Sequence, residues 1–288
     1  MLRVAAPAKI NLCLHVGGRR ADGYHALESL VCFAEIGDML TFAPAQTLSL
    51  SVEGPFAAGL AKHDENLVLR AAEALAASVK TQKGAAITLT KNLPVASGIG
   101  GGSADAAAAL RGLVQLWKAD VGDSILNEIG LSLGSDVPVC LKSAPAIMSS
   151  RGEVLKPAPA LPRAAMLLVN PGVSVSTAEV FAALGRSETD TIIPLPSLPA
   201  QGWATARELA QGLDAARNDM EAPARAIAPV IGEVLEALRE TDPLLARMCG
   251  SGATCYALYE SGDAAEGAAR KLSAAHPGWW ISATRIAD

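Results

Sequence analysis

The chain has 288 residues, of which 50% are hydrophobic and 18% are charged, and its formal net charge is −5. This length is enough for two domains or one large one, each with a substantial core. The negative charge argues against a general nucleic-acid-binding protein, and no apolar run approaches the ~20 residues that a membrane span needs.

Cysteines, histidines and the N-terminal segment exclude further classes. The five cysteines lack metal-type spacing and the four histidines are scattered, so we expect reduced, buried thiols and no metal site built by the protein alone. Residues 1–18 are interrupted by Arg3, Lys9, Asn11 and His15 and lack the apolar middle of a signal peptide. We therefore expect a cytoplasmic protein.

Up to about residue 141 the chain alternates between strand-like and helix-like segments. Leu67, Ala71 and Leu75 have the spacing of one helix face. This mixed order predicts an α+β layer rather than a regular parallel sheet. The predicted strands are residues 3–16, 39–44, 47–54 and 85–92, and the predicted helices are residues 65–79, 103–117 and 125–133.

The composition changes near residues 154–166, where several prolines predict a linker. Beyond it, a helix is expected from Thr177, and the clearest helix of the chain follows Pro229, which suits a first-turn position. An alanine-rich helix precedes the last strand. The order predicts a second α+β domain with antiparallel strands, formed by residues 164–170, 246–249, 255–259 and 279–286.

A glycine-rich segment, LPVASGIGGGSADAAAAL, runs from Leu93 to Leu110. If a helix begins near Ser103, its free N–H groups and the positive end of its dipole face the preceding loop. Gly98 and Gly100–Gly102 would let the backbone approach phosphate oxygens without side-chain clashes. The segment predicts a phosphate-binding loop, although a tight turn that serves only packing is also open.

Two common phosphate motifs fit this loop poorly. A P-loop requires a lysine, and none occurs between Lys91 and Lys118. A dinucleotide-binding fingerprint would place Ser103 where its last glycine belongs. Asp120 and Asp123 lie at a suitable distance for a ribose contact, but no strand leads into them.

A third pattern, Pro94-x-x-x-Gly98-Ile99-Gly100 followed by Ser103, resembles the phosphate loop of the GHMP kinases, a superfamily of small-molecule kinases. Further segments, in order along the chain, resemble the branch of that superfamily that acts on 4-diphosphocytidyl-2-C-methyl-D-erythritol. The resemblance covers nearly the whole chain. Its segments are PAKINLCLHV, RRADGYHALESL, GSDVPVC, NPGVSVSTAEVF, ARNDME and MCGSGATCYAL.

The resemblance implies a fold, a domain division and an activity. It implies a two-domain α+β fold: an N-terminal ribosomal-S5-like ATP-binding domain over residues 1–155 and a C-terminal ferredoxin-like substrate domain with an antiparallel sheet over residues 156–288. Whether the last strand packs back on the first domain stays open. The implied reaction is transfer of the ATP γ-phosphate to the 2-hydroxyl of the cytidine-linked methylerythritol, in the non-mevalonate isoprenoid pathway. A monomer or weak homodimer is implied.

The resemblance also implies a catalytic pair. Asp136 in GSDVP matches the family's general base, which accepts the proton of the attacking hydroxyl. Lys9 in PAKINL matches its lysine partner, whose ammonium would hold the carboxylate ionised and offset charge on the transferred group. Taken singly, Asp136 also suits a helix cap or turn, and Lys9 a solvated strand end.

Binding residues follow from the same resemblance. Tyr24 and Phe181 match the aromatic pair that sandwiches cytosine, and His25 would bond the pyrimidine edge. Mg²⁺ is expected with ATP, with Ser103 as a possible ligand, since Ala104 stands where many relatives have a second serine. Asn11 and Thr177 are expected near the methylerythritol. The residues expected to bind ATP are Asn66, Lys91, Pro94, Val95, Ala96, Ser97, Gly98, Ile99, Gly100, Gly101, Gly102, Ser103 and Ala104.

Two other functions remain open at this point. Another kinase of the superfamily would act on homoserine, mevalonate or a sugar, but none of these has a base that Tyr24 and His25 could recognise. A non-catalytic RNA-binding module has similar α+β layers, but the net acidity and the presence of both Lys9 and Asp136 speak against it.

Overall fold

A computed structural model of the protein describes residues 1–60 and 66–287. Within these residues, no helix has both the length and the apolar character needed to cross a membrane. The strands are β1 (Leu2–Asn11), β2 (His15–Arg19), β3 (His25–Ala45), β4 (Leu48–Glu53), β5 (Gly84–Thr90), β6 (Ala146–Ser150), β7 (Val154–Pro157), β8 (Ala165–Asn170), β9 (Leu245–Met248), β10 (Cys255–Tyr259) and β11 (Trp280–Arg285). The helices are the short η1 (Ala57–Gly59), α1 (Leu67–Ser78), α2 (Gly101–Trp117), α3 (Asp123–Leu133), α4 (Val137–Lys142), α5 (Thr177–Leu184), α6 (Ala206–Gly212), α7 (Glu221–Ile227), α8 (Val230–Arg239) and α9 (Gly262–Ala275).

The chain forms two compact units that are interleaved along the sequence. β1 and β3 each contribute residues to both units. The domain boundary expected at residue 155 stays a prediction. The first unit consists of Met1–Lys9, Ile36–Val95 and Gly100–Ser143. The second consists of Ile10–Glu35, Ala96–Ile99 and Ala144–Asp288.

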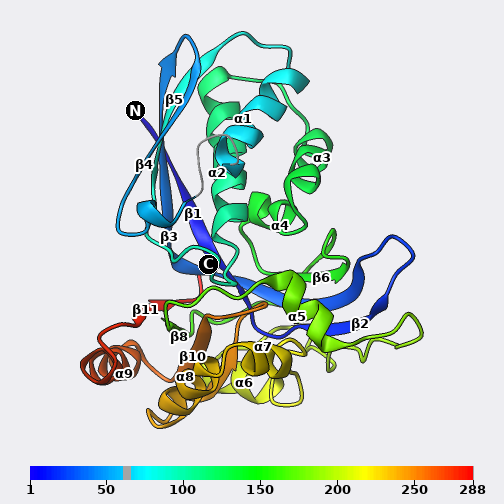
Figure 1. The fold of residues 1–288 in the computed structure, drawn as a ribbon, viewed down its shortest axis with the longest axis vertical. Coiled ribbons are helices and arrows are strands. Elements are labelled where there is room, and N and C mark those ends of the chain that lie inside the picture. Colours follow the sequence, from blue (N-terminus) through cyan, green and yellow to red (C-terminus); the bar gives the residue numbers. More distant parts are fainter. Residues whose placement is uncertain (61–65, 288) are drawn as a thin grey trace. The chain divides into compact units, whose positions relative to one another are not determined.

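In the first unit, strands are covered by helices on one side (Figure 1). β1 pairs with β3, β3 runs antiparallel to β5, and β5 runs parallel to β4. Half of the buried residues of helix α2 are alanines, and one is Gly112, so the helix can lie close to the strands. A Cβ atom on Gly112 would lie 2.3 Å from Cε2 of Phe42 on β3, so only glycine allows this approach.

The second unit contains an antiparallel sheet in the order β11-β8-β10-β9 (Figure 1). All residues of β8 and β10 are buried, which explains why their sequences, apart from Asn170 at the end of β8, are apolar rather than alternating. Helix α8 packs its stripe of Ile231, Val234, Leu235 and Leu238 into the same core.

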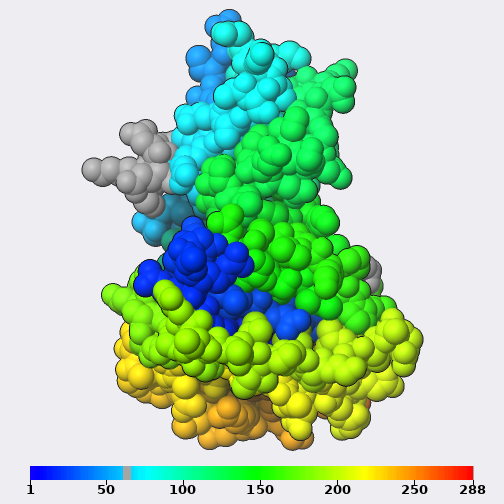
Figure 2. Space-filling view, turned by 90° about the vertical axis from the view of Figure 1, so that its right-hand side faces the viewer, coloured from blue at the N-terminus to red at the C-terminus, as the bar shows by residue number. Residues whose placement is uncertain are grey.

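A smaller set of strands completes the second unit. Residues of β3 pair with β2 and, antiparallel, with β6, which pairs with β7. Figure 2 shows the β2–β3 hairpin, in dark blue, on the surface beside the yellow-green segment that follows α5. The backbone N–H of Gly18 in β2 donates to the carbonyl oxygen of Asp190 in that segment.

Most predicted elements are confirmed, with shifts that have local causes. The strand predicted over residues 3–16 ends at Asn11 and resumes at His15. The helix predicted from Ser103 begins at Gly101, since Gly100 adopts a left-handed conformation just before it. Strand β7 lies inside the predicted linker. The cysteines are free and buried, as expected.

Candidate active site

The start of α2 forms a backbone cradle in the first unit. Gly100, at the N-cap position, has φ +64°, and a Cβ atom there would lie 3.1 Å from the Cβ of Lys9. No side chain of the described residues caps the helix. The amide of Ala104 bonds to the Gly100 carbonyl, so the N–H groups of the preceding turn are those that a helix leaves without an internal partner. This cradle fits a phosphate group.

Lys9 and Asp136 meet beside this cradle. The Lys9 Nζ lies 2.9 Å from Oδ2 of Asp136, and the side chains are 4% and 33% exposed. Asp136 occupies the N-cap position of α4, yet its carboxylate makes no capping bond and is directed to Lys9. A buried ammonium therefore holds a carboxylate that a ligand hydroxyl can reach from solvent.

Ser103 lies near the segment that carries Asp136. A Cβ atom on Gly134, in the loop before α4, would lie 3.9 Å from the Ser103 hydroxyl oxygen. The sequence segment that carries Asp136 thus runs past the first turn of α2. Three segments distant in sequence, β1, α2 and the α3–α4 connection, bring Lys9, Ser103 and Asp136 together.

Lys91 lies on another side of the α2 start and is buried. Its Nζ is 2.5 Å from Oδ2 of Asp38 and 2.7 Å from Oδ2 of Asp105. Burial lowers the pKa of Lys91, but the neighbouring carboxylates of Asp105 and Asp38 outweigh it, so that the pKa lies above its usual value. Since the ammonium is held by two carboxylates, any contact with adenosine falls to other atoms of Lys91.

The carboxylates of Asp38 and Asp105 differ in the hydrogen bonds of their Oδ1 atoms. Oδ1 of Asp38 accepts the backbone N–H groups of Asn92 and Leu93, at 2.6 Å and 2.8 Å, at the entrance to the glycine loop. Oδ1 of Asp105 is buried and has no hydrogen-bond partner among the described residues. Burial raises the pKa of Asp105 to about 7, against the opposing pull of Lys91.

Asn66, the other residue expected at adenosine, caps α1. Its side-chain oxygen accepts the N–H of Val68 at 2.9 Å. The structure gives the oxygen of Asn66 a local role, which a residue of this type before a helix commonly has.

The middle of the glycine loop, Ala96–Ile99, belongs to the second unit and packs on the turn between β9 and β10. Gly98 has φ +79°, and a Cβ atom there would lie 2.5 Å from the carbonyl oxygen of Gly252. The N–H of Thr254 donates to the carbonyl oxygen of Ser97. The GSGAT segment thus supports residues 96–99, the middle of the glycine loop.

The same turn is flanked by Asn11 and Thr177. Asn11 is buried, and its Nδ2 donates to the Ser29 hydroxyl at 2.8 Å. A Cβ atom on Gly250 would lie 3.4 Å from Oδ1 of Asn11. The hydroxyl of Thr177, exposed at the start of α5, lies 2.7 Å from that of Ser251. Ser251 was not among the predicted residues, although its place in GSGAT could have indicated it.

The aromatic candidates occupy the β2–β3 hairpin and α5. The rings of His25 and Phe181 stack with centroids 5.0 Å apart and an angle of 13° between their planes. Nδ1 of His25 lies 3.1 Å from the carbonyl oxygen of Gly17, which fixes the ring. Tyr24 is 53% exposed, and the guanidinium of Arg151 lies over its ring. The ring that contacts Phe181 is therefore His25.

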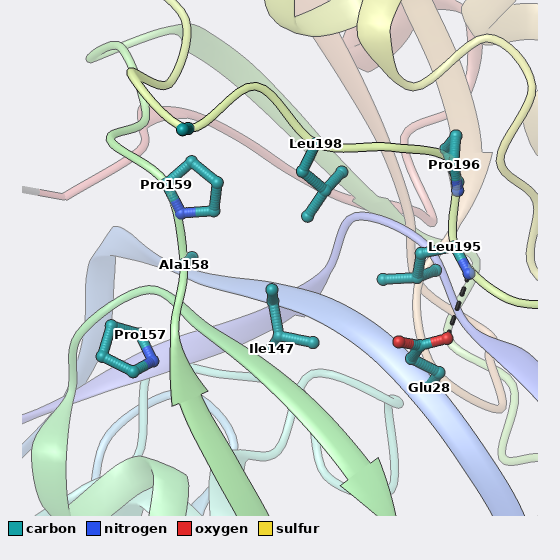
Figure 3. Close-up of a pocket in the computed structure, with 9 residues that line it drawn as sticks. Glu28, Ile147, Pro157, Ala158, Pro159, Leu195, Pro196 and Leu198 are labelled. Atoms are coloured by element: carbon teal, nitrogen blue, oxygen red, sulfur yellow. Dashed lines mark hydrogen bonds between the residues drawn. The ribbon is translucent and has the colours of Figure 1, made fainter.

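A separate pocket of about 420 Å³ lies in the second unit. Figure 3 shows it among prolines and aliphatic side chains, with the Glu28 carboxylate accepting the N–H of Leu195. The residues predicted to bind ATP or the cytidine substrate are not among its lining. The lining residues are Glu28, Ile147, Pro157, Ala158, Pro159, Leu195, Pro196, Leu198 and Ala200.

Comparisons with known proteins agree with the sequence resemblance. Residues 66–144 match the family described as GHMP kinases N terminal domain, and residues 195–278 match GHMP kinases C terminal. The chain is 53% identical over 285 residues to the 4-diphosphocytidyl-2-C-methyl-D-erythritol kinase of Paramagnetospirillum magneticum, covering 98% of each protein. It is 51% identical over 290 residues to that of Cereibacter sphaeroides, covering 100% of each.

Solved structures show the same relationship. A crystal structure of 4-(cytidine 5'-diphospho)-2C-methyl-D-erythritol kinase is 33% identical, covers 100% of both chains and has a TM-score of 0.81. A homoserine kinase from Cytophaga hutchinsonii, at 18% identity and TM-score 0.70, shares the fold. The predicted two-domain GHMP kinase fold is confirmed, with a mixed N-terminal sheet and a four-stranded antiparallel C-terminal sheet. The chain belongs to the GHMP kinase superfamily, in the family of the 4-diphosphocytidyl-2-C-methyl-D-erythritol kinases.

Proposed function

We propose that this chain transfers the γ-phosphate of ATP to the 2-hydroxyl of 4-diphosphocytidyl-2-C-methyl-D-erythritol, giving ADP and the 2-phosphate, in the non-mevalonate isoprenoid pathway. Full-length similarity to kinases of that name supports the choice of substrate. The structural observation that carries the chemistry is the ion pair of Lys9 and Asp136, 2.9 Å apart beside the left-handed Gly100.

We assign two roles in the phosphate transfer, phosphate binding and proton acceptance, to different parts of the site. Backbone N–H groups at the start of α2 bind the ATP phosphates, whose negative charge suits the positive end of the helix dipole. Asp136 accepts the proton of the 2-hydroxyl while the oxygen–phosphorus bond forms and the bond between the γ-phosphorus and its bridging oxygen to the β-phosphate breaks. A positioned carboxylate of this kind contributes roughly 10²–10⁴-fold in rate.

Lys9 serves Asp136 in this scheme. Its ammonium keeps the carboxylate ionised before the transfer, so that the carboxylate can accept a proton. The aliphatic part of the Lys9 side chain lies against Gly100, so that its ammonium is carried close to the cradle and can offset negative charge on a bound phosphate.

Magnesium is part of the proposal. Within the described residues no three histidine, cysteine or acidic side chains gather as a metal cluster. Mg²⁺ does not require such a cluster, because in nucleotide sites it keeps several waters and is bound by only one or two protein carboxylates together with the substrate phosphates. Ser103 offers one hydroxyl oxygen in the first turn of α2. When bound, the ion neutralises charge on the phosphates.

Cytidine recognition is assigned to the second unit. Tyr24 and Phe181 offer aromatic faces, and the ring of His25 can bond the pyrimidine edge. Asn11 and Thr177, both next to the turn that holds Gly250 and Ser251, are assigned to the methylerythritol end. A cytoplasmic location and a monomeric or weakly dimeric state belong to the same proposal.

The test is an ADP-release assay with Mg²⁺ and a panel of acceptors: the cytidine-linked methylerythritol, homoserine, mevalonate and galactose. We expect turnover with the cytidine-linked acceptor alone, inhibited by cytidine diphosphate. Turnover with another acceptor and no protection by cytidine diphosphate would assign the chain to a different kinase activity.

A further inference from the structure

Tyr24, the proposed cytosine-stacking residue, lies at an exposed hairpin. The loop between β2 and β3 is closed by bonds from Arg20 N–H to the Tyr24 carbonyl and from Gly23 N–H to the Arg20 carbonyl. Tyr24 is 53% exposed. A ring in this position loses rotational freedom when a base stacks on it, which weakens binding unless something fixes it beforehand.

Arg151 supplies such a contact. Its guanidinium carbon lies 5.1 Å from the centroid of the Tyr24 ring, within the range of a cation–π interaction. Arg151 comes from the turn between β6 and β7. Since Ser150 pairs with Leu27 across β6 and β3, the strand register brings this turn next to the hairpin.

Arg151 is in turn held by Glu153. Oε2 of Glu153 accepts the backbone N–H of Arg151 at 2.8 Å, and Oε1 lies 3.8 Å from the Arg151 Nε. Oε1 also accepts the Ser150 hydroxyl at 2.9 Å, and Ser150 bonds to Arg20 of the hairpin. Desolvation raises the pKa of Glu153, but backbone hydrogen bonds from Glu153 and Arg151 outweigh it and lower the pKa below its usual value. Glu153 therefore stays ionised as the partner of Arg151.

We infer that Arg151 is a positioning residue for cytidine: it covers one face of the Tyr24 ring and fixes the ring so that the opposite face can stack on the base. This inference rests on the proposed function, because it assigns Tyr24 to the cytosine. A planar guanidinium stacks on an aromatic ring in a way that the compact ammonium of lysine does not reproduce.

The test is a double-mutant cycle on the full-length protein, with cytidine diphosphate as the probe in calorimetric titrations. R151M is expected to raise the Kd about 3–10-fold, the range set by one cation–π contact plus one ordered side chain. R151K should recover little of this. In a Y24L background, R151M should change the Kd by less than about twofold, because its effect acts through the ring.

Steady-state kinetics separate positioning from folding. R151M should raise the KM for the cytidine substrate while kcat and the KM for ATP stay within about twofold. R207M is the matched control, because Arg207 also forms an exposed ion pair with a glutamate, Glu260, and should leave the Kd unchanged.

Three other outcomes would each overturn the positioning role of Arg151. If Y24L weakens cytidine diphosphate binding and R151M does not, the inference is wrong while the proposed function stands. If R151M weakens binding equally in the Y24L background, Arg151 contacts the nucleotide directly and the positioning role is wrong. If the wild-type protein does not bind cytidine diphosphate, the proposed function fails and the inference fails with it.

Discussion

Two lysine side chains lie against the glycines at the start of α2, and the surroundings of their ammonium groups differ. Lys9 contacts Gly100 and pairs with Asp136, whose side chain is 33% exposed. The Nζ of Lys91 lies 3.1 Å from where a Cβ of Gly101 would be and pairs with Asp38 and Asp105, which are 0% and 4% exposed. Only the first pair has a carboxylate that a substrate can reach.

The buried ion pairs stabilise the start of α2, and the more exposed ion pair is accessible for chemistry. The buried cluster of Lys91, Asp38 and Asp105 ties β3, the entrance of the glycine loop and α2 to one another. The open pair of Lys9 and Asp136 then acts at a fixed place. Five predictions test whether stability and catalysis are divided in this way.

The largest effect is expected for Lys91→Met. The substitution leaves two buried carboxylates without their cation, and breaking a buried ion pair in this way costs about 3–5 kcal/mol. Urea unfolding should show the loss in the free energy of unfolding. An unchanged unfolding midpoint would mean that the cluster does not hold the first unit together.

Lys9→Met should lower turnover strongly and stability less than Lys91→Met does. We expect turnover to fall by about 10²–10³-fold, because the substitution removes the charge that orients Asp136 and faces the phosphate cradle. The unfolding midpoint should shift less than in Lys91→Met, since water can reach the Asp136 carboxylate once its partner is gone. Turnover near the wild-type value would remove Lys9 from the mechanism.

Asp105→Asn tests the buried cluster through pH. Burial raises the pKa of Asp105 to about 7, so the folded protein holds a proton that the unfolded chain, with a pKa near its ordinary 3.8, has released. Stability from this group is present at low pH and lost as pH rises through 7. Between pH 5 and 8 the free energy of unfolding should therefore fall more steeply in the wild type than in Asp105→Asn.

The control for this pH series is Asp120→Asn, which changes an exposed aspartate beyond the end of α2. It should keep the wild-type slope. Equal slopes in the wild type and Asp105→Asn would show that Asp105 does not titrate in this range.

The smallest effect is expected for Gly100→Ala. Its left-handed backbone costs a residue with a Cβ roughly 1–2 kcal/mol, and the added carbon would press on Lys9. We expect the KM for ATP to rise several-fold. Gly122→Ala is the matched control: it also precedes a helix, but its φ is −74° and its Cβ would meet nothing within 4 Å.

Sequence reasoning predicted the open pair better than the buried cluster. The ordered segments around Lys9, Gly100 and Asp136 are specific to a family, so their meeting could be inferred before any coordinates. Asp38 was missed because it stands 53 residues before Lys91 in the chain, and only the pairing of Met39 with Thr90 across β3 and β5 reveals that the two are neighbours.

Other gaps have similar causes. The burial of Lys91 between two carboxylates could not be predicted from the sequence, because charged residues are usually exposed. Helix α4 has only six residues, too few for a periodic pattern, so its place beside α2 could not be read from the sequence. The stacking of His25 with Phe181 depends on tertiary contact between segments far apart in the chain.

The most direct test compares Asp136→Asn with Asp38→Asn, one carboxylate from each lysine cluster, by measuring ADP release and the unfolding midpoint on the same samples. We expect Asp136→Asn to lose about 10²–10⁴-fold in turnover with little change in the unfolding midpoint. We expect Asp38→Asn to lose about 1–3 kcal/mol of stability while the folded fraction keeps most of its turnover. Near-normal turnover in Asp136→Asn would show that this carboxylate is not the proton acceptor.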